Sequence, residues 1–239
     1  MRYLILSDLH ANWEALQAVL GDARGKYDQI VCCGDLVGYG PDPNAVTEWV
    51  RTSVGPVVRG NHDRGCAGLI DLEWFNPVAR TANLWTATQL TKANLNYLRD
   101  LPTGPVTVAG FQISHGSPFD EDEYLLTLKE ATGALRRLET SLAFFGQTHI
   151  QGAFTWMHGR FEAVSRAQLP LYRDAAWLIN PGAVGQPRDG DPRAAYALYD
   201  TGLNQVLQCR VSYDYEATAR KILAAGLPDM LAARLAIGR

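Results

Sequence analysis

Cysteine is scarce in this sequence, and the few residues present form no pattern. The chain has 239 residues and four cysteines: Cys32 and Cys33 are adjacent, and Cys66 and Cys209 stand alone. This spacing excludes a disulfide framework and a Cys-x-x-Cys metal site. No segment reaches the roughly 18 uninterrupted apolar residues that a membrane-spanning helix needs. Because Asp8 comes too early for a signal peptide, we expect a cytoplasmic protein without a membrane partner.

An excess of charge of one sign is also missing. The formal net charge is -3, which gives no electrostatic basis for a stable nucleic-acid partner, although a nucleotide substrate remains compatible. Hydrophobic residues make up 47% and charged residues 20%, the balance of a globular protein with a substantial core. We found no repeat, low-complexity stretch or linker, and therefore expect one domain over 1–239 with a helical insert near 70–101.

Apolar runs alternate with helical patterns in the first quarter of the chain. Short buried strands are expected at 4–6, 30–33 and 56–59, with helices at 12–20 and 43–51 between them. This β-α-β-α-β order implies a parallel sheet with right-handed crossovers.

The rest of the chain adds a helical middle and further strand pairs. Two sheets with helices outside them are the simplest packing of this inventory. Helices are expected at 77–90, 93–98, 125–138 and 215–237, the last broken near Gly226, and strands at 106–108, 111–114, 142–145, 152–157, 161–165, 177–179, 194–199 and 204–211.

Residues of the kinds that bind metals follow five of the expected strands. Ligand sites in open α/β sheets gather at the carboxyl ends of the strands, so these side chains should meet in one crevice. They are Asp8, His10, Asp35, Asn61, His62, Asp63, His115, Gln147 and His149.

The residue types indicate which ions would fit. Mixed carboxylate, imidazole and amide-oxygen ligands suit Mn, Fe, Ni or Zn. Asp8 and His10 can bind one ion from a single extended turn, and Asp35 is the candidate for a carboxylate that bridges two ions roughly 3.5–4 Å apart. Taken singly, Asp8 and Asp35 are equally typical of caps and turns, so the combination carries the prediction.

The order of these residues along the chain resembles that of a known family, the calcineurin-like metallophosphoesterases. The resemblance rests on Asp8-x-His10, Gly34-Asp35, Gly60-Asn61-His62-Asp63, His115-Gly116 and Gly146-x-x-His149, and residues 180–187 resemble the small bacterial and archaeal branch related to YfcE-type phosphodiesterases. It implies an α/β (α+β) fold in which two mixed β-sheets, flanked by helices, form a four-layer sandwich. It also implies a metal-dependent phosphoesterase, most simply a phosphodiesterase, that uses a hydroxide activated by two metal ions.

The resemblance also implies two ligand sets, carried over position by position. Manganese is the expected ion, with Fe, Ni and Zn as alternatives. One ion would be bound by Asp8, His10, Asp35 and His149, and the other by Asp35, Asn61 and His115.

Two further positions concern the chemistry of this site. His62 would protonate the leaving oxygen, with Asp63 orienting the ring and raising its pKa. Gln147 stands where the family has a histidine, and its neutral oxygen is a poorer ligand than imidazole for these ions. We therefore expect a second ion that is bound more weakly or is more oxygen-loving, such as Mn. His158 is the other candidate for that ligand, but it falls in an expected hairpin turn away from the strand ends.

Candidate substrate contacts are less specific. Arg188 and Arg193 either bind phosphate, which suits a guanidinium, or belong to a solvated loop, and Tyr39 either lines the substrate crevice or packs within its loop. The aromatic residues of the insert are expected in the core or in an interface rather than as a base-stacking platform. They are Trp74, Phe75 and Trp85.

Three functions remain open at this stage. The first is hydrolysis of a phosphodiester or phosphomonoester, whether a small molecule or a nucleotide. The second is a catalytically silent binding scaffold, as in relatives that lost active-site histidines, and the third is another chemistry at a mononuclear site. The intact Asn61-His62-Asp63 favours the hydrolase, because a scaffold needs no general acid. A homo-oligomer is compatible with the sequence.

Overall fold

The computed structural model describes residues 1–239 and arranges the strands in two mixed sheets. The first sheet has the order β2-β1-β10-β11-β8 and the second β3-β4-β5-β9-β6-β7. The strands are β1 (Arg2–Leu6), β2 (Gln29–Cys32), β3 (Val106–Val108), β4 (Phe111–Ile113), β5 (Leu142–Phe144), β6 (Gly152–Met157), β7 (Arg160–Val164), β8 (Gln168–Pro170), β9 (Ala176–Asn180), β10 (Ala194–Asp200) and β11 (Gln205–Val211).

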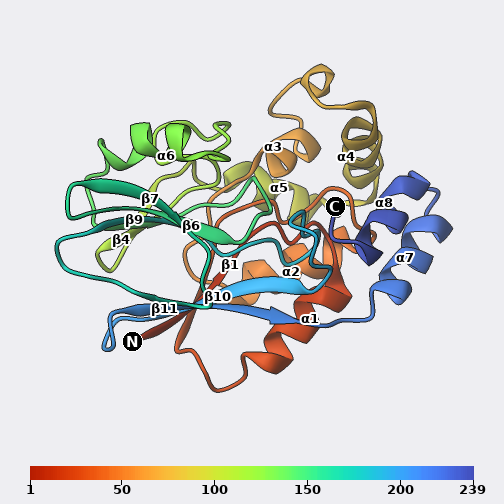
Figure 1. The fold of residues 1–239 in the computed structure, drawn as a ribbon. Coiled ribbons are helices and arrows are strands. Elements are labelled where there is room, and N and C mark those ends of the chain that lie inside the picture. The colour runs from red at the N-terminus through yellow and green to blue at the C-terminus, as the bar shows by residue number, and fades with distance from the viewer.

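The sheets lie face to face and helices cover their outer faces (Figure 1). Helix α6 lies over the second sheet, and α1 packs against β10 and β11 of the first. The helices are α1 (Trp13–Asp22), α2 (Pro43–Ser53), α3 (Asn61–Cys66), α4 (Pro77–Gln89), α5 (Lys92–Asp100), α6 (Leu128–Leu135), α7 (Tyr215–Ala224) and α8 (Asp229–Ala233), with 3-10 helices η1 (Leu72–Trp74) and η2 (Arg234–Ala236).

Strand β1 shows how the layers form, because its successive side chains point to opposite faces. Leu4 and Leu6 pack outward with Leu16 of α1, whereas Tyr3 and Ile5 point into the core between the two sheets. A further apolar cluster lies between α6 and the outer face of the second sheet. Three buried apolar layers thus separate four layers of structure, which confirms the predicted four-layer α/β sandwich.

The expected third strand, 56–59, is reduced to a single parallel bridge between Cys32 and Val57. The reason is local: the Val58 amide still donates to the Cys32 carbonyl at 3.2 Å, but the next amide on that side, that of Gly60, donates to Asp63 Oδ2 at 2.9 Å instead of to β2. The chain then turns directly into α3, a short helix that begins at Asn61 and that the sequence patterns did not indicate. Helix α6 is shorter than expected, and β8 was not expected.

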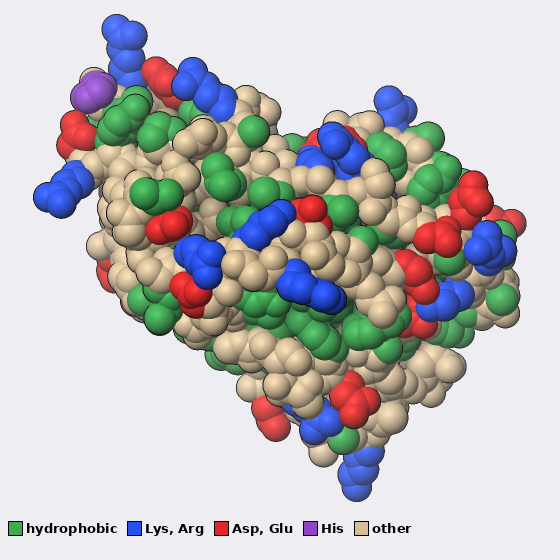
Figure 2. Space-filling view, turned by 90° about the horizontal axis from the view of Figure 1, so that it is seen from below, with side chains coloured by type: hydrophobic (Ala, Val, Ile, Leu, Met, Phe, Trp, Pro, Cys, Tyr) green, Lys and Arg blue, Asp and Glu red, His purple; other side chains and the backbone are tan.

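Charge is evenly distributed over the face drawn in Figure 2, where acidic and basic side chains are interspersed with apolar ones. This agrees with 22 Lys and Arg against 25 Asp and Glu in the whole chain. None of the helices combines the length and the apolarity that crossing a membrane requires.

Candidate metal centre

The site forms where strand ends of both sheets meet. Strands β1 and β2 are parallel in the first sheet, and β4 and β5 are parallel in the second. The loop after β1 is joined to that after β2 by the Asp8 amide, which donates to the Gly34 carbonyl at 3.0 Å. It is joined to the second sheet by the Gln147 amide, which donates to Asp8 Oδ1 at 3.2 Å. Segments up to 139 residues apart in sequence therefore share one site.

Four of the predicted ligands form one tight, buried group. One ligand atom from each lies within 4.8 Å of the others, and all four side chains are buried. The group consists of Asp8, His10, Asp35 and His149. His115 and Asn61 lie beside it, with His115 Nε2 3.4 Å from Asp35 Oδ2 and 3.3 Å from Asn61 Oδ1.

The three imidazoles of the site all use their Nδ1 in the same way. Nδ1 of His10, His115 and His149 lies 3.0, 2.8 and 2.6 Å from the carbonyls of Val37, Cys33 and Gln186. A carbonyl can only accept, so each Nδ1 carries the hydrogen and, in a neutral ring, each Nε2 presents a lone pair to the centre. Such a backbone partner is the usual means of orienting a metal-binding histidine.

The lone pairs of His10 and His149 face other acceptors rather than donors. His10 Nε2 lies 3.1 Å from His149 Nε2, and His149 Nε2 lies 3.3 Å from Asp8 Oδ1. Asp8 Oδ2 and Gln147 Oε1 are buried and have no hydrogen-bond partner. A buried cluster of unpaired acceptors is unfavourable unless a cation joins it, so this donor set fits divalent metal ions.

Asp35 has the position expected of a shared ligand. Its Oδ1 accepts a hydrogen bond from the His62 backbone amide at 2.9 Å, at the start of α3. Its Oδ2 lies 3.5 Å from His10 Nε2 and 3.4 Å from His115 Nε2. One carboxylate oxygen therefore faces an imidazole from each of the two implied ligand sets.

The charges of the site shift several pKa values in opposite directions. Burial raises the pKa of Asp8 to about 6, and His115 opposes that shift. Burial would also raise the pKa of Asp35, but the imidazoles of His115 and His62 hold it well below its usual range. Burial lowers the pKa of His10 and His149 well below the ordinary value, so both rings are neutral and able to bind metal. His115 is the exception: burial would lower its pKa, yet Asp35 raises it to about 10.

The loops that carry these side chains have an unusual backbone. Positive φ angles at non-glycine residues are uncommon and cost energy. The site has them at Asp8 (52°), His10 (44°), Asp35 (52°), Gln147 (66°) and His149 (59°). This concentration at the predicted ligands is typical of a backbone held in place for function.

His62 lies next to this cluster, but its partner is not the expected one. The structure corrects the prediction that Asp63 orients the ring, because the Asp63 carboxylate accepts hydrogen bonds from the backbone amides of Leu36, Val37 and Gly60. Asn83 of α4 takes that place, with its Oδ1 2.8 Å from His62 Nδ1. Burial lowers the pKa of His62, whereas an increase was expected.

Asn83 was missed because nothing near it resembles a motif. Its one signal is a polar residue on the buried face of α4, between Ala79, Ala82 and Thr86. Polar groups on such a face need a partner, and here the partner is a histidine 21 residues earlier.

A cavity of about 630 Å³ opens beside the cluster. Among its lining residues are Asn61, His62, Gln147, Tyr39 and Arg188. The Arg188 guanidinium lies 5.5 Å from the centre of the Tyr39 ring, which in turn packs 4.3 Å from the His62 ring. Two of the three candidate substrate contacts thus border the cluster.

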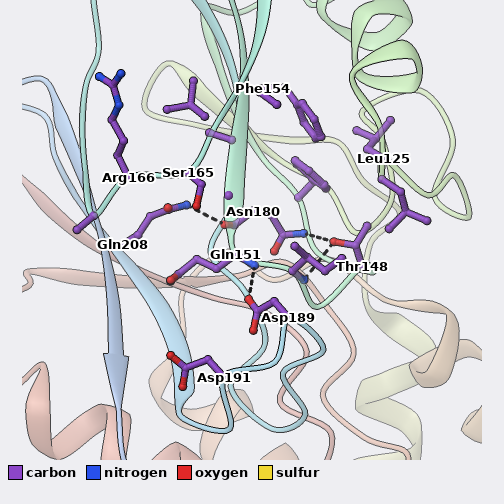
Figure 3. Close-up of a pocket in the computed structure, with 18 of the residues that line it drawn as sticks. Leu125, Thr148, Gln151, Phe154, Ser165, Arg166, Asn180, Asp189, Asp191 and Gln208 are labelled. Atoms are coloured by element: carbon purple, nitrogen blue, oxygen red, sulfur yellow. Dashed lines mark hydrogen bonds between the residues drawn. The ribbon is translucent and has the colours of Figure 1, made fainter. Parts of the chain in front are cut away.

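Arg193 is not brought to this cavity. It pairs with Asp191 and lines a larger cavity of about 800 Å³ on the other side of the loop that carries His149. Figure 3 shows that the polar groups there bond to one another: Asn180 Nδ2 donates to Thr148 Oγ1 at 3.0 Å and the Gln151 amide to Asp189 at 3.1 Å. The placement of Arg193 removes it from the candidate substrate contacts.

The remaining predictions concern surface residues. The His158 side chain is 73% exposed in the turn between β6 and β7 and lies 3.5 Å from Asp174, far from the cluster. Trp74 is 90% exposed and is not a core residue, whereas Phe75 and Trp85 are partly buried in the apolar cluster of α4, α7 and α8.

Comparison with known proteins identifies the architecture. Residues 1–203 match the model of the calcineurin-like phosphoesterase superfamily domain. The chain belongs to this superfamily. It is 34% identical to the uncharacterized protein MJ0912 of Methanocaldococcus jannaschii, over 98% of this chain and 97% of that protein.

Two solved structures extend the likeness over the whole chain. A metallophosphoesterase from Sphaerobacter thermophilus is 40% identical, with a TM-score of 0.88 over 100% of this chain and 99% of that one. The hypothetical protein PH1004 from Pyrococcus horikoshii shares the fold at 22% identity, with a TM-score of 0.82 and coverage of 100% and 98%. Membership in this metal-dependent superfamily of phosphoester hydrolases, together with the buried Asp/His cluster, confirms the predicted family and a potential metal-binding site.

Proposed function

We propose that this calcineurin-like phosphoesterase hydrolyses phosphodiesters at a dinuclear metal site, with manganese as the preferred ion. The observation that carries the proposal is the inward orientation of three imidazole Nε2 atoms onto Asp8 and Asp35, with the rings of His10 and His149 neutral. Iron, nickel and zinc also suit these ligands.

The distances around Asp35 support the two ligand sets that the resemblance implies. Asp8, His10 and His149 would hold one ion with Asp35, and His115 and Asn61 would hold the other with the same carboxylate. Gln147 is the further candidate for the second ion, since its Oε1 is buried and unpaired while its Nε2 donates to the Asp122 carbonyl at 3.0 Å.

When bound, the ions would supply Lewis acidity and a strong nucleophile at neutral pH. Arg188 would bind the phosphoryl oxygens, because it lines the cavity and has no carboxylate partner. His62 would give a proton from Nε2 to the leaving oxygen, while its Nδ1–H stays bonded to Asn83 Oδ1. The arrival of an anionic phosphoester offsets the burial that lowers the pKa of His62 and so favours the protonated ring.

The test couples metal analysis to an assay. The purified protein is reconstituted with Mn, its metal content is measured, and bis-p-nitrophenyl phosphate is compared with the monoester p-nitrophenyl phosphate. We expect two ions per chain, metal-dependent turnover, and a higher kcat/KM for the diester.

The variant His62→Ala separates catalysis from binding. It should retain its metal and lose turnover by roughly 10²–10⁴-fold on a substrate with a poor leaving group. His158→Ala is the matched control, because that histidine is exposed and remote from the cluster. Filled metal sites without turnover on either substrate would instead support the binding scaffold.

A further inference from the structure

Trp74 is the most exposed large aromatic residue of the chain, and it lies at the cavity of the candidate metal centre. It is 90% exposed, yet it lines the same cavity of about 630 Å³ as Asn61 and His62. Ligand pockets typically measure about 300–1,000 Å³, so this space takes a group much larger than a phosphoryl group.

The backbone on both sides of Trp74 is held by specific contacts, so the exposed indole is attached to an ordered segment. Phe75 packs into the apolar cluster of α4 and lies 5.1 Å from the His62 ring, centre to centre. The Asp71 side chain accepts a hydrogen bond from the Glu73 amide at 2.9 Å, which begins the 3-10 turn η1. The fold thus ties η1 to the site through Phe75 and leaves the neighbouring indole without a packing partner.

A second aromatic side chain reaches the cavity from a distant segment. Tyr124 follows the loop that carries His115, is 44% exposed and lines the cavity. Burial raises its pKa to about 12, so the phenol is neutral at working pH. Two partly or fully exposed aromatic faces, from different segments, therefore border one cavity.

Two arginines line this cavity, and only one of them is paired with carboxylates. Arg64 is engaged by Glu121 and Asp122. Arg188 has only the neutral Gln186 Oε1 as a side-chain acceptor, at 2.9 Å. The cavity therefore has an unpaired cation, Arg188, and the aromatic side chains of Trp74 and Tyr124. A ligand that joins an anionic group to a flat ring would fit this lining.

We infer that the phosphoester substrate carries a flat aromatic group, such as the base of a nucleoside phosphate, and that Trp74 and Tyr124 bind this group. The inference rests on the proposed function for the position of the phosphate. For Trp74, this inference replaces the expectation from the sequence that the residue lies in the core or in an interface. That expectation is unchanged for Phe75 and Trp85.

The first test measures binding without turnover. In a His62→Ala background loaded with Mn, calorimetry compares adenosine 5′-monophosphate with ribose 5-phosphate, which lacks the base. We expect the nucleotide to bind roughly tenfold more tightly, as stacking on an aromatic side chain gives. Trp74→Ala should abolish that difference and Trp74→Phe should retain most of it. Equal affinities for the two ligands, or a difference that survives in Trp74→Ala, would overturn the inference.

The matched control is Trp156→Ala. Trp156 is a 40% exposed tryptophan on β6 that does not line this cavity. It should leave the preference for the nucleotide unchanged. Because Trp74 makes no core contact, Trp74→Ala is expected to melt at the wild-type temperature, so a loss of binding is not a loss of folding.

The second test uses the active protein and keeps the two proposals distinguishable. The kcat/KM of Trp74→Ala relative to wild type is measured for bis-p-nitrophenyl phosphate and for an aliphatic diester, so that leaving-group reactivity cancels within each substrate. We expect a roughly tenfold loss for the aryl ester only. Equal losses of kcat/KM on both substrates would refute aromatic recognition. So would a dimeric wild-type protein that becomes monomeric in Trp74→Ala. Absence of turnover on every substrate would refute the proposed function, while the binding test would still decide the role of Trp74.

Discussion

At the scale of single residues, Asn83 links helix α4 to the candidate general acid. Its Oδ1 accepts from His62 Nδ1 at 2.8 Å and also from the Cys66 thiol at 3.4 Å. This contact fixes which nitrogen of His62 carries the hydrogen and leaves Nε2 facing the cavity. The side chain acts through His62 and is a positioning residue.

Replacing Asn83 should therefore change catalysis without changing metal content. Asn83→Ala leaves a buried Nδ1–H unpaired, and we expect kcat to fall roughly tenfold. Asn83→Asp places a carboxylate beside the ring, which favours the imidazolium, so the basic limb of the pH–rate profile should move to higher pH. A pH–rate profile identical to that of wild type in Asn83→Asp would show that Asn83 does not act through His62.

Gln147 is the residue that sets the second metal apart. Its unpaired Oε1 can bind a metal, but it carries no charge and donates more weakly than imidazole. Gln147→His should strengthen the second site. Titration with limiting Zn, followed by metal analysis, should show near-complete double occupancy at a lower metal concentration than in wild type. An unchanged second affinity would place Gln147 outside the ligand set.

At the scale of elements, the site depends on close contact between the turn before α3 and the loop after β2. A Cβ added at Gly60 would lie 2.6 Å from the Asp35 backbone nitrogen and closer still to its carboxylate. Only glycine fits there, because any side chain would displace the carboxylate that both ligand sets share.

Gly60→Ala tests this contact. We expect a loss of about 1–3 kcal/mol in the free energy of unfolding, from forced displacement of packed atoms, together with reduced occupancy of both metal sites. Urea unfolding and metal analysis measure the two effects. Gly133→Ala in α6 is the control, since no atom lies within 4 Å of its added Cβ. If Gly60→Ala matched this control in both measurements, the contact would be unimportant.

The predictable part of the site is the part encoded locally. Asp8, Asp35 and His115 each follow an apolar run, and the rule that strand ends gather ligands brings them together. Asn83 and the backbone partners of the imidazoles depend on which helix face meets which loop, and that is decided by packing between distant segments. The lost third strand has a different cause, because the Gly60 amide that would extend its pairing with β2 donates to Asp63 Oδ2, only three residues later, at the start of α3.

At the scale of the whole molecule, buried acceptors that follow strands of both sheets meet at the site. Asp8 follows a strand of the first sheet and His149 follows a strand of the second, and the lone pair of His149 Nε2 lies 3.3 Å from Asp8 Oδ1, so this repulsion acts across the interface between the sheets. Ions bound there would convert this repulsion into attraction. Metal binding should therefore stabilise the entire fold and not the loops alone.

Removal of metal should lower the melting temperature of the protein. A ligand present at 100 times its dissociation constant stabilises by about 2.7 kcal/mol, which for a chain of this size corresponds to roughly 5–10 °C. Differential scanning calorimetry with and without a chelator measures the shift. Asp35→Asn removes the charge shared by both ligand sets, so its melting temperature should no longer respond to the chelator, whereas Asp174→Asn, on the exposed surface, should respond as wild type does. A chelator effect of equal size in Asp35→Asn would mean that the stabilising ions bind elsewhere, because no other carboxylate faces imidazoles from both sets.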